Sequence, residues 1–427
     1  MSNHAKDQRP RGIRPVQRIE LSERNLKRQW ILLVLFIVIA LVAFGYGIYS
    51  FLVSETEPSV GWQVIKPTTD ASLCGDDFIF NYCWEEGGTK EEYKRLVSVY
   101  SQAIRTADRL FGLDADVLED KNLVAINANV NKAVEVDAAL YAALTTFGES
   151  SGRYLYMAPL HAAYYDTFFS NSHAAIVGDL DPYVNAETAE YYATLATFAA
   201  DPASVSLELL GENRVRLSVS QEYLDFAKAN SISVFIDFFR LRNAVIVDYL
   251  ADELTDAGFT YGSISSYDGY VRNLDPQENA YSYNLFDRME NEVGVVARLG
   301  YKGAASIVYL RNYPLGEQDA RYFYLSSERS IPPFADPADG LYRTAFAGLI
   351  SISDAHGCTE LALALLPIYV AEEPDVAALN ALLMGQGIAT AWCDGERQVV
   401  YHNHERMKPQ EFYVYDDVTY TAVFAGE

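Results

Sequence analysis

Cysteine is scarce in this chain, and its few cysteines form no recognisable chemical motif. Only Cys74, Cys83, Cys358 and Cys393 occur in 427 residues, which excludes a small disulfide scaffold. No Cys-x-x-Cys pair or Cys/His cluster indicates zinc binding or redox work. In one continuous strand, Cys74 and Cys83 would lie roughly 30 Å apart, too far to form a disulfide. A Ser-His-Asp arrangement, a P-loop and a dinucleotide-binding glycine fingerprint are also missing, so these enzyme classes have no support.

Positive charge is scarce beyond the first 30 residues. That segment has 8 Lys+Arg against 3 Asp+Glu, a net charge of +5. The remainder, residues 31–427, has 33 − 8 = 25 Lys+Arg against 58 − 3 = 55 Asp+Glu, a net charge of −30. Nucleic acid and anionic lipid both require clustered positive charge, so we expect no nucleic-acid partner. The acidic balance suits a domain at an outer surface, although solubility alone also explains it.

One long uncharged run occurs, from Trp30 to Val53. Its 24 residues are enough to cross a hydrocarbon core as one helix and are too many for the apolar core of a cleaved signal peptide. The basic flank precedes the run, so the positive-inside rule predicts a cytoplasmic tail at 1–29, a signal-anchor helix at 30–53, a stalk at 54–73 and an extracytoplasmic domain at 74–427. A buried core helix is the alternative, but it would not require this charge asymmetry. We therefore expect a single-pass protein of the cell membrane.

Helices and strands are mixed after the stalk without a regular repeat. Thr89 and Glu92 form a capping-box pattern before a helix to about residue 110, and a glycine turn joins two strands at 205–209 and 214–218. The other expected helices are 136–147, 185–199, 221–229, 239–257, 358–366 and 375–383. The other expected strands are 231–236, 261–266, 293–298, 304–310, 320–325, 344–353 and 412–424, with a hairpin at Asp394-Gly395. This order predicts one continuous α+β domain.

The order and spacing of residues 74–403 resemble those of the FAD:protein FMN transferases (the ApbE-type family). The most specific stretch is VFIDFFRLRNAVIVDYLADELTDAGF, residues 234–259, in which Asp237 and Asp248 match two family aspartates eleven residues apart. Members of that family move FMN from FAD onto a Thr hydroxyl of a target protein and hold Mg²⁺ at the pyrophosphate. The resemblance therefore implies a transferase-like fold, and FAD and Mg²⁺ as cofactors if the activity is retained.

Several family motifs are replaced in this chain. The family glycine loop, Gly-Gly-Ile-Ala-Lys-Gly, becomes residues 239–244, with Phe239 at the first glycine and Asn243 at the lysine. A late metal motif, Asp-x-x-x-Thr, becomes Glu360-x-x-x-Ala364. Pyrophosphate binding requires close backbone N–H groups or a positive side chain, together with oxygen ligands for the metal. The sequence therefore predicts a catalytically degenerate domain, and the alternative is an active but atypical flavin transferase.

The candidate site residues are Asp237, Arg240 and Arg242 for a flavin-like ligand and Glu360 for a metal. The two arginines lie near a predicted helix N-terminus, where free N–H groups favour anions. Alternatively, Asp237 only caps the helix, and the arginines pair with carboxylates of this acidic domain. Tyrosine clusters would line a flavin pocket, fill the core or form a surface for a partner protein; they are Tyr154/Tyr156, Tyr164/Tyr165 and Tyr281/Tyr283. We therefore expect a membrane-anchored module that binds a flavin-like ligand or a partner protein.

Overall fold

The computed structural model divides into two compact units, Met1–Glu57 and Pro58–Glu427. It describes residues 31, 35–36, 59–68, 75–113, 121–170, 179–289, 292–325, 330–383, 385–415 and 418–425. The predicted basic tail and most of the predicted 30–53 span lie outside these residues, and so does Cys74. Among the described residues, no helix has the length and hydrophobicity needed to cross a bilayer.

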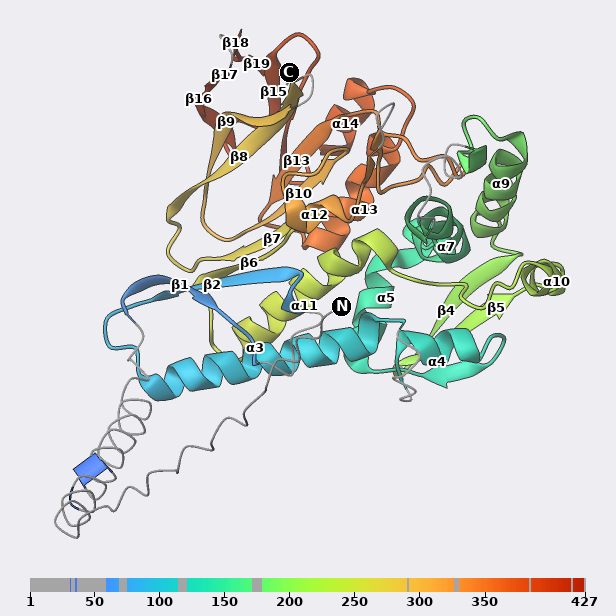
Figure 1. Cartoon of the computed structure of the whole chain (residues 1–427), viewed down its shortest axis with the longest axis horizontal. Coiled ribbons are helices and arrows are strands. Elements are labelled where there is room, and N and C mark those ends of the chain that lie inside the picture. Colours follow the sequence, from blue (N-terminus) through green and yellow to red (C-terminus); the bar gives the residue numbers. More distant parts are fainter. Residues whose placement is uncertain are drawn as a thin grey trace, which may run out of the picture. The chain divides into compact units, whose positions relative to one another are not determined.

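A nine-stranded sheet forms the centre of the larger unit (Figure 1). Its neighbours are all antiparallel except the last pair, β15 and β19, which is parallel. The order across the sheet is β1 (Gly61–Ile65), β2 (Phe78–Trp84), β6 (Gly262–Ser266), β7 (Tyr270–Leu274), β10 (Ala305–Arg311), β13 (Gly348–Ser353), β14 (Ile388–Cys393), β15 (Gln398–His402) and β19 (Thr421–Phe424).

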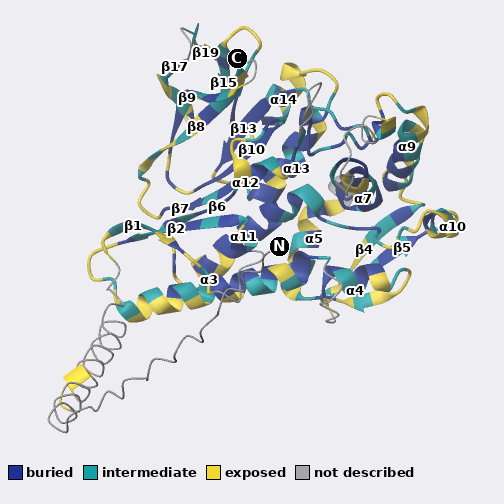
Figure 2. Cartoon of the chain, in the orientation of Figure 1, coloured by how far each residue is buried: buried dark blue, intermediate teal, exposed yellow. Residues whose placement is uncertain are grey.

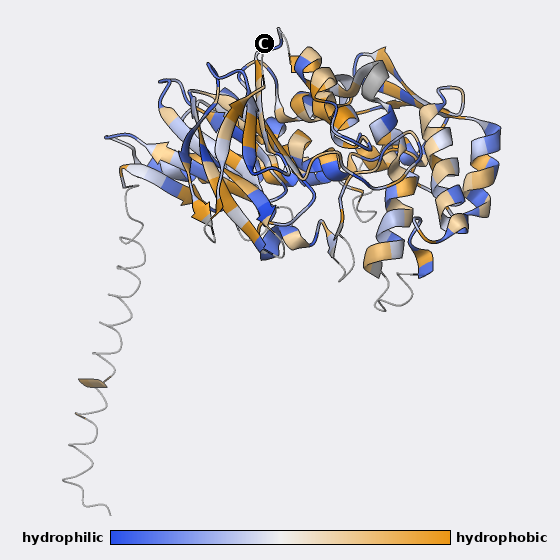
Figure 3. Ribbon diagram, turned by 90° about the horizontal axis from the view of Figure 1, so that it is seen from above, coloured by the Kyte–Doolittle hydropathy of each residue, from blue (hydrophilic) through white to orange (hydrophobic). Residues whose placement is uncertain are grey.

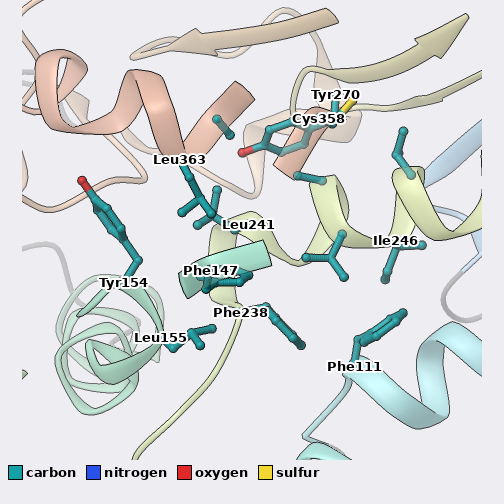
Figure 4. Close-up of a cluster of buried hydrophobic side chains, with 14 of the residues drawn as sticks. Phe111, Phe147, Tyr154, Leu155, Phe238, Leu241, Ile246, Tyr270, Cys358 and Leu363 are labelled. Carbon is teal, nitrogen blue, oxygen red and sulfur yellow. The ribbon is translucent and has the colours of Figure 1, made fainter. Parts of the chain in front are cut away.

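Helices α3 (Lys90–Phe111), α11 (Arg242–Asp256) and α13 (Cys358–Tyr369) pack with one face of this sheet. The predicted capping box of α3 is present, because the Thr89 hydroxyl accepts from the N–H of Glu92 while the Glu92 carboxylate accepts from the N–H of Thr89. Phe238, just before α11, inserts between Phe111 and Phe147, with ring centroids 5.8 and 5.4 Å away (Figure 4). Burial of these rings fixes the start of α11 against the core.

The opposite face of the sheet is covered by a second, three-stranded sheet in the order β16 (Lys408–Phe412), β9 (Glu292–Lys302) and β8 (Ala280–Met289). A separate hydrophobic cluster fills the space between them, with Leu299 of β9 and Ile307 of β10 both fully buried. Figure 3, coloured by hydropathy, shows hydrophobic residues along the strands of the larger unit. The predicted α+β class is therefore confirmed.

A mostly helical region follows α3 in the chain and carries a small sheet in the order β3-β5-β4 (Figure 1). The expected hairpin and the helices capped by Asn185 and Ser220 are present. The elements of this region are α4 (Leu123–Ala128), β3 (Ala133–Glu135), α5 (Ala138–Ser151), α6 (Arg153–Tyr156), α7 (Ala158–Tyr165), the π-helix η2 (Asp166–Ser170), α9 (Ala186–Ala200), β4 (Val205–Gly211), β5 (Arg214–Val219) and α10 (Gln221–Ala229).

The strand expected at residues 231–236 is not formed. These residues belong to no strand, and at residues 235 and 236 the side chain of Asn127 binds the backbone groups that a strand would pair. The Asn127 amide oxygen accepts from the N–H groups of Phe235 and Ile236 at 2.8 and 3.1 Å, and its nitrogen donates to the carbonyl of Ile236 at 2.9 Å. A buried side chain therefore satisfies the backbone that a neighbouring strand would otherwise pair.

Three further expectations are wrong in their details. Residues 320–325 contain the end of α12 (Glu317–Ala320) and the short β11 (Tyr324–Leu325), because the Asp319 carboxylate accepts from the N–H groups of Leu315 and Gly316, both at 2.7 Å, and starts a helix. The C-terminal tail forms the short strands β17 (Val414–Tyr415) and β18 (Val418–Thr419) and then β19, rather than one strand. Part of the expected stalk, Gly61–Ile65, is β1 of the large sheet. The remaining elements are β12 (Ser330–Ile331) and α14 (Val376–Leu383).

Candidate functional site

The turn that leads into α11 is held at its first residue, Asp237. The backbone N–H of Asp237 donates to the Leu155 carbonyl at 3.1 Å, which joins the turn to α6. Burial raises the pKa of the Asp237 carboxyl, while the neighbouring backbone of Phe239 and the charge of Arg242 oppose the rise. Neither the 3₁₀ turn that comes next nor α11 has a side-chain hydrogen bond at its N-cap, so the alternative in which Asp237 caps the helix is wrong. Asp237 joins the turn to α6 through its backbone.

Phe239 adopts a backbone conformation that favours glycine. Its φ is +45°, in the left-handed region, where a bulky side chain is strained. A short 3₁₀ turn, η3 (Phe239–Leu241), follows and runs directly into α11. The Phe239 ring stacks on the imidazole of His161, with centroids 3.8 Å apart and planes inclined by 9°. The sequence resemblance places the first glycine of the family's loop at this position, and in this chain an aromatic ring occupies the space beside the backbone.

Arg240 lies on the same aromatic stack. Its guanidinium carbon is 4.7 Å from the centroid of Phe239 and 5.0 Å from that of Tyr322. No ion pair formed by the described residues includes Arg240, and its buried Nε has no hydrogen-bond partner there. The sequential arrangement is therefore imidazole, phenyl ring, guanidinium and phenol. The face of a guanidinium binds aromatic rings, and its edge remains suited to an anion.

His161 is fixed in this arrangement as a neutral side chain. It is buried, and its Nδ1 lies 2.8 Å from the Tyr342 hydroxyl. Burial, assisted by the charge of Arg240, lowers the pKa of His161 to about 3. Tyr342 in turn stacks on Tyr164 at 3.7 Å. One of the tyrosines that the sequence offered for a flavin pocket is therefore packed in the core.

A half-buried carboxyl group, that of Asp268, lies next to this stack. It accepts hydrogen bonds from the Ser266 hydroxyl at 2.6 Å and from the Asn243 amide at 3.0 Å. The same amide donates to the Tyr322 hydroxyl at 3.2 Å. Burial raises the pKa of Asp268, and the hydrogen bonds and the charges of Arg311 and Arg240 oppose the rise. Asn243, where the sequence resemblance places the family's lysine, therefore supports a half-buried carboxyl group.

Arg242 points to a different partner. Its guanidinium donates to the Asp108 carboxylate of α3 at 2.9 Å, in a pair whose side chains are 33% and 47% exposed. This is the alternative in which an arginine pairs with a carboxylate of the domain. Asp237, Arg240 and Arg242 are thus neighbours in one turn, but only Arg240 lies on the aromatic stack.

Glu360 lies in the first turn of α13. Its carboxylate accepts from the backbone N–H of Gly357 at 3.4 Å and lies 3.3 Å from Nδ1 of His356. Asp248 of α11 provides the main cap of this helix: it accepts from the N–H groups of Cys358 and Thr359, both at 2.8 Å, and pairs with Arg272 at 2.9 Å. The second aspartate of the resemblance therefore joins α11 to α13.

The side chains around this turn offer neither the close backbone approach that the family uses for a pyrophosphate nor a group of ligands for Mg²⁺. The ring of Phe239 lies where a glycine would leave room for a pyrophosphate to approach the backbone. Glu360 is a single, 53% exposed carboxylate that already accepts from the helix N-terminus. In the part of the chain that the structure describes, no three His, Cys, Asp or Glu side chains are grouped to hold a metal ion.

Sequence reasoning missed three members of the cluster, which are His161, Asp268 and Tyr322. His161 lies in α7, Asp268 in the turn between β6 and β7, and Tyr322 between α12 and β11, and no local motif surrounds any of them. Their common feature is spatial, because all three contact or influence Arg240 or Asn243. Only the folded chain brings them together.

Comparisons with known proteins agree with this fold. No family description and no curated protein sequence matches the chain. Among solved structures, the chain is similar to the ApbE protein of Thermotoga maritima, with a TM-score of 0.51 and 12% identity over 78% of this chain and 94% of that one. It is also similar to the flavin transferase ApbE of Vibrio cholerae, with a TM-score of 0.50 and 11% identity over 78% of this chain and 92% of that one. At such identities the likeness concerns the fold alone, and the chain therefore has an ApbE-like, flavin transferase-like fold.

Proposed function

We propose that this protein is a membrane-anchored, extracytoplasmic binding module that has lost flavin transfer. The observation that carries the proposal is the ring of Phe239, held at φ +45° against His161. A glycine at this position would allow close approach of a phosphate group to the backbone, and a phenyl ring prevents it. The proposed anchor is the uncharged run at residues 30–53, with the basic tail in the cytoplasm.

Loss of catalysis agrees with the chemistry that phosphoryl transfer requires. That reaction depends on positioning of the phosphates and on neutralisation of their charge by metal ions and positive side chains. Here Asn243 bonds Asp268, Arg242 pairs with Asp108, and Glu360 caps α13. Of the cationic side chains in the turn, Arg240 is the one left without an ion pair among the described residues.

The proposed ligand is therefore an anion that Arg240 can contact at the edge of its guanidinium, with a flavin-like ligand as the candidate that the fold favours. A partner protein is the second candidate, supported by the exposed aromatic residues of the domain. Titration of the full chain in detergent with FAD, with and without Mg²⁺, separates the two. Saturable binding supports the flavin-like ligand, and no binding supports a partner protein.

An active but atypical flavin transferase remains the alternative function, because the fold and the acidic residues Asp237, Asp248 and Glu360 are all present. The same preparation, incubated with FAD, Mg²⁺ and an acceptor protein that contains a flavinylation Thr, tests it. Covalent flavin on the acceptor would overturn the proposed loss of catalysis. Its absence, in a preparation that is folded and monodisperse, supports the loss.

A further inference from the structure

Strand β1 carries an exposed apolar surface at the free edge of the nine-stranded sheet. Trp62 and Val64 alternate along it and are 47% and 57% exposed, whereas Ile65 on the opposite face is 2% exposed. A period of two places Trp62 and Val64 on one side of the strand, and Val60, which is 65% exposed, immediately precedes the strand. We name Val60, Trp62 and Val64 the β1 patch. In Figure 2, β1 contains exposed and intermediate residues while the strands in the middle of the sheet are largely buried.

The β1 patch is held in place by its neighbours. The Trp62 ring packs edge-on against Tyr261 and Tyr281, with centroids 5.6 and 6.4 Å away. The preceding segment is held by Gln63, whose amide donates to the carbonyl of Ser59 at 2.7 Å. The Trp62 indole is therefore packed against two tyrosines while about half of it remains exposed. Exposed apolar surfaces of this kind mark contacts with a partner or a membrane.

Charge also distinguishes the β1 patch from the rest of the domain. Residues 58–65 contain no charged side chain, although residues 31–427 carry a net charge of 25 − 55 = −30. A strongly acidic surface is repelled by anionic lipid, so an uncharged surface is the part of this domain that can approach a bilayer without that cost. Trp and Tyr are the residues that favour the membrane–water interface, because one end of each ring is apolar and the other is polar.

The position of the β1 patch in the sequence, close to the uncharged run, indicates that the patch contacts the membrane. Only six residues, 54–59, lie between Val53, the end of the uncharged run, and Val60. The seven Cα–Cα steps from Val53 to Val60 span at most roughly 25 Å when extended, less than the thickness of a bilayer. If the run crosses the membrane, as proposed above, β1 is tethered within that distance of the outer leaflet. We infer that the β1 patch lies in the headgroup region of that leaflet and fixes the orientation of the domain on the membrane.

Trp62 fluorescence in a lipid bilayer tests this inference, which rests on the proposed anchor. The full chain is reconstituted in phosphatidylcholine vesicles whose acyl chains are either plain or brominated, since bromine quenches tryptophan on contact. The emission of Trp62 is the difference between the wild type and Trp62→Phe. The control is the same difference for Trp84→Phe, because Trp84 lies on the neighbouring strand and is 4% exposed. Trp30→Phe reports in the same way on the predicted span.

We expect the Trp62 component to be blue-shifted and to lose intensity in brominated vesicles, and the Trp84 component to be unchanged. Quenching of Trp30 without quenching of Trp62 would show an anchored protein whose β1 patch faces water, and would overturn the inference alone. A Trp62 component that is blue-shifted at high protein density but insensitive to bromine would indicate pairing with a second copy, and would also overturn it. No quenching of either tryptophan would overturn the anchor and the inference together.

Discussion

Replacing Phe239 by glycine and by alanine tests whether the turn before α11 stores backbone strain. At φ +45° a residue with a Cβ is strained by about 1–2 kcal/mol, and glycine is not. Both substitutions remove the ring, its stacking on His161 and its contact with Arg240. Only the glycine also removes the strain, so the two variants separate the backbone contribution from that of the side chain.

The expected magnitudes follow from these contacts. Stacking is worth about 0.5–1.5 kcal/mol, the cation–π contact about 0.5–1 kcal/mol, and burial of part of the ring about 1 kcal/mol. We therefore expect Phe239→Ala to lower the free energy of unfolding by about 2–3 kcal/mol. Phe239→Gly relieves the backbone strain, but it also makes the unfolded chain more flexible, which offsets part of that gain. Its loss of free energy of unfolding is therefore smaller than that of Phe239→Ala by about 1 kcal/mol.

Urea unfolding, followed by circular dichroism with the full chain in detergent, measures this difference. Ala244→Gly is the matched control, because Ala244 is a fully buried residue of α11. There glycine is the less stable residue by about 1 kcal/mol, the opposite order. If Phe239→Ala were as stable as Phe239→Gly, or more stable, the backbone at this position would not be strained and the account of the turn would be wrong.

Three further variants test the polar groups around the turn. Arg240→Ala should weaken FAD binding by about 1–3 kcal/mol in calorimetric titration, the usual value of hydrogen bonds to charged groups. Arg242→Ala should leave FAD binding unchanged, because Arg242 is already paired with Asp108. Equal losses in the two variants would contradict this assignment. His161 has a pKa of about 3 in the folded protein, so unfolding takes up a proton below pH 6.5. The contribution of His161 to the free energy of unfolding is complete above pH 6.5 and falls by about 1.4 kcal/mol per pH unit as the pH drops toward 3. In urea titrations at several pH values, His161→Phe should lack this slope; an identical slope in both proteins would refute the burial argument. Burial raises the pKa of Asp268 in the folded state, so the contribution of Asp268 to the free energy of unfolding is lost as the pH rises through that pKa. Asp268→Asn should therefore gain stability relative to the wild type between acidic and neutral pH. A difference in the free energy of unfolding that does not change with pH would contradict this prediction.

Local signals predicted the elements whose hydrogen bonds are local. The capping box at Thr89, the hairpin around Gly211 and the helix capped by Ser220 depend on residues a few positions apart, and all three are present. The strand expected at 231–236 failed because Asn127, more than 100 residues earlier, binds its backbone. The expectations therefore held where the hydrogen bonds of an element are local, and failed where a residue distant in the sequence binds its backbone.

The candidate site shows the same limit. The spacing of Asp237 and Asp248 located the turn and the helix that form its frame; Asp248 caps α13, whereas the backbone N–H of Asp237 joins the turn to α6. Arg240 and Arg242 are two residues apart and carry the same charge, but Arg240 contacts aromatic rings whereas Arg242 pairs with Asp108. The sequence does not distinguish these two sets of partners. His161 and Asp268 carry no motif, and their shifted pKa values arise from burial that only the fold creates.

The most direct test of the proposed loss of catalysis is covalent flavin transfer by the wild-type protein. The full chain in detergent, FAD, Mg²⁺ and a Thr-containing acceptor are incubated, and the acceptor is analysed for covalent flavin by mass spectrometry and by fluorescence of the denatured protein. A known flavin transferase with the same acceptor is the positive control. We expect no flavin on the acceptor, because Phe239 stands where the sequence resemblance places a phosphate-binding glycine and no metal site accompanies Glu360 among the described residues. Mg²⁺-dependent flavinylation by this protein would contradict the account.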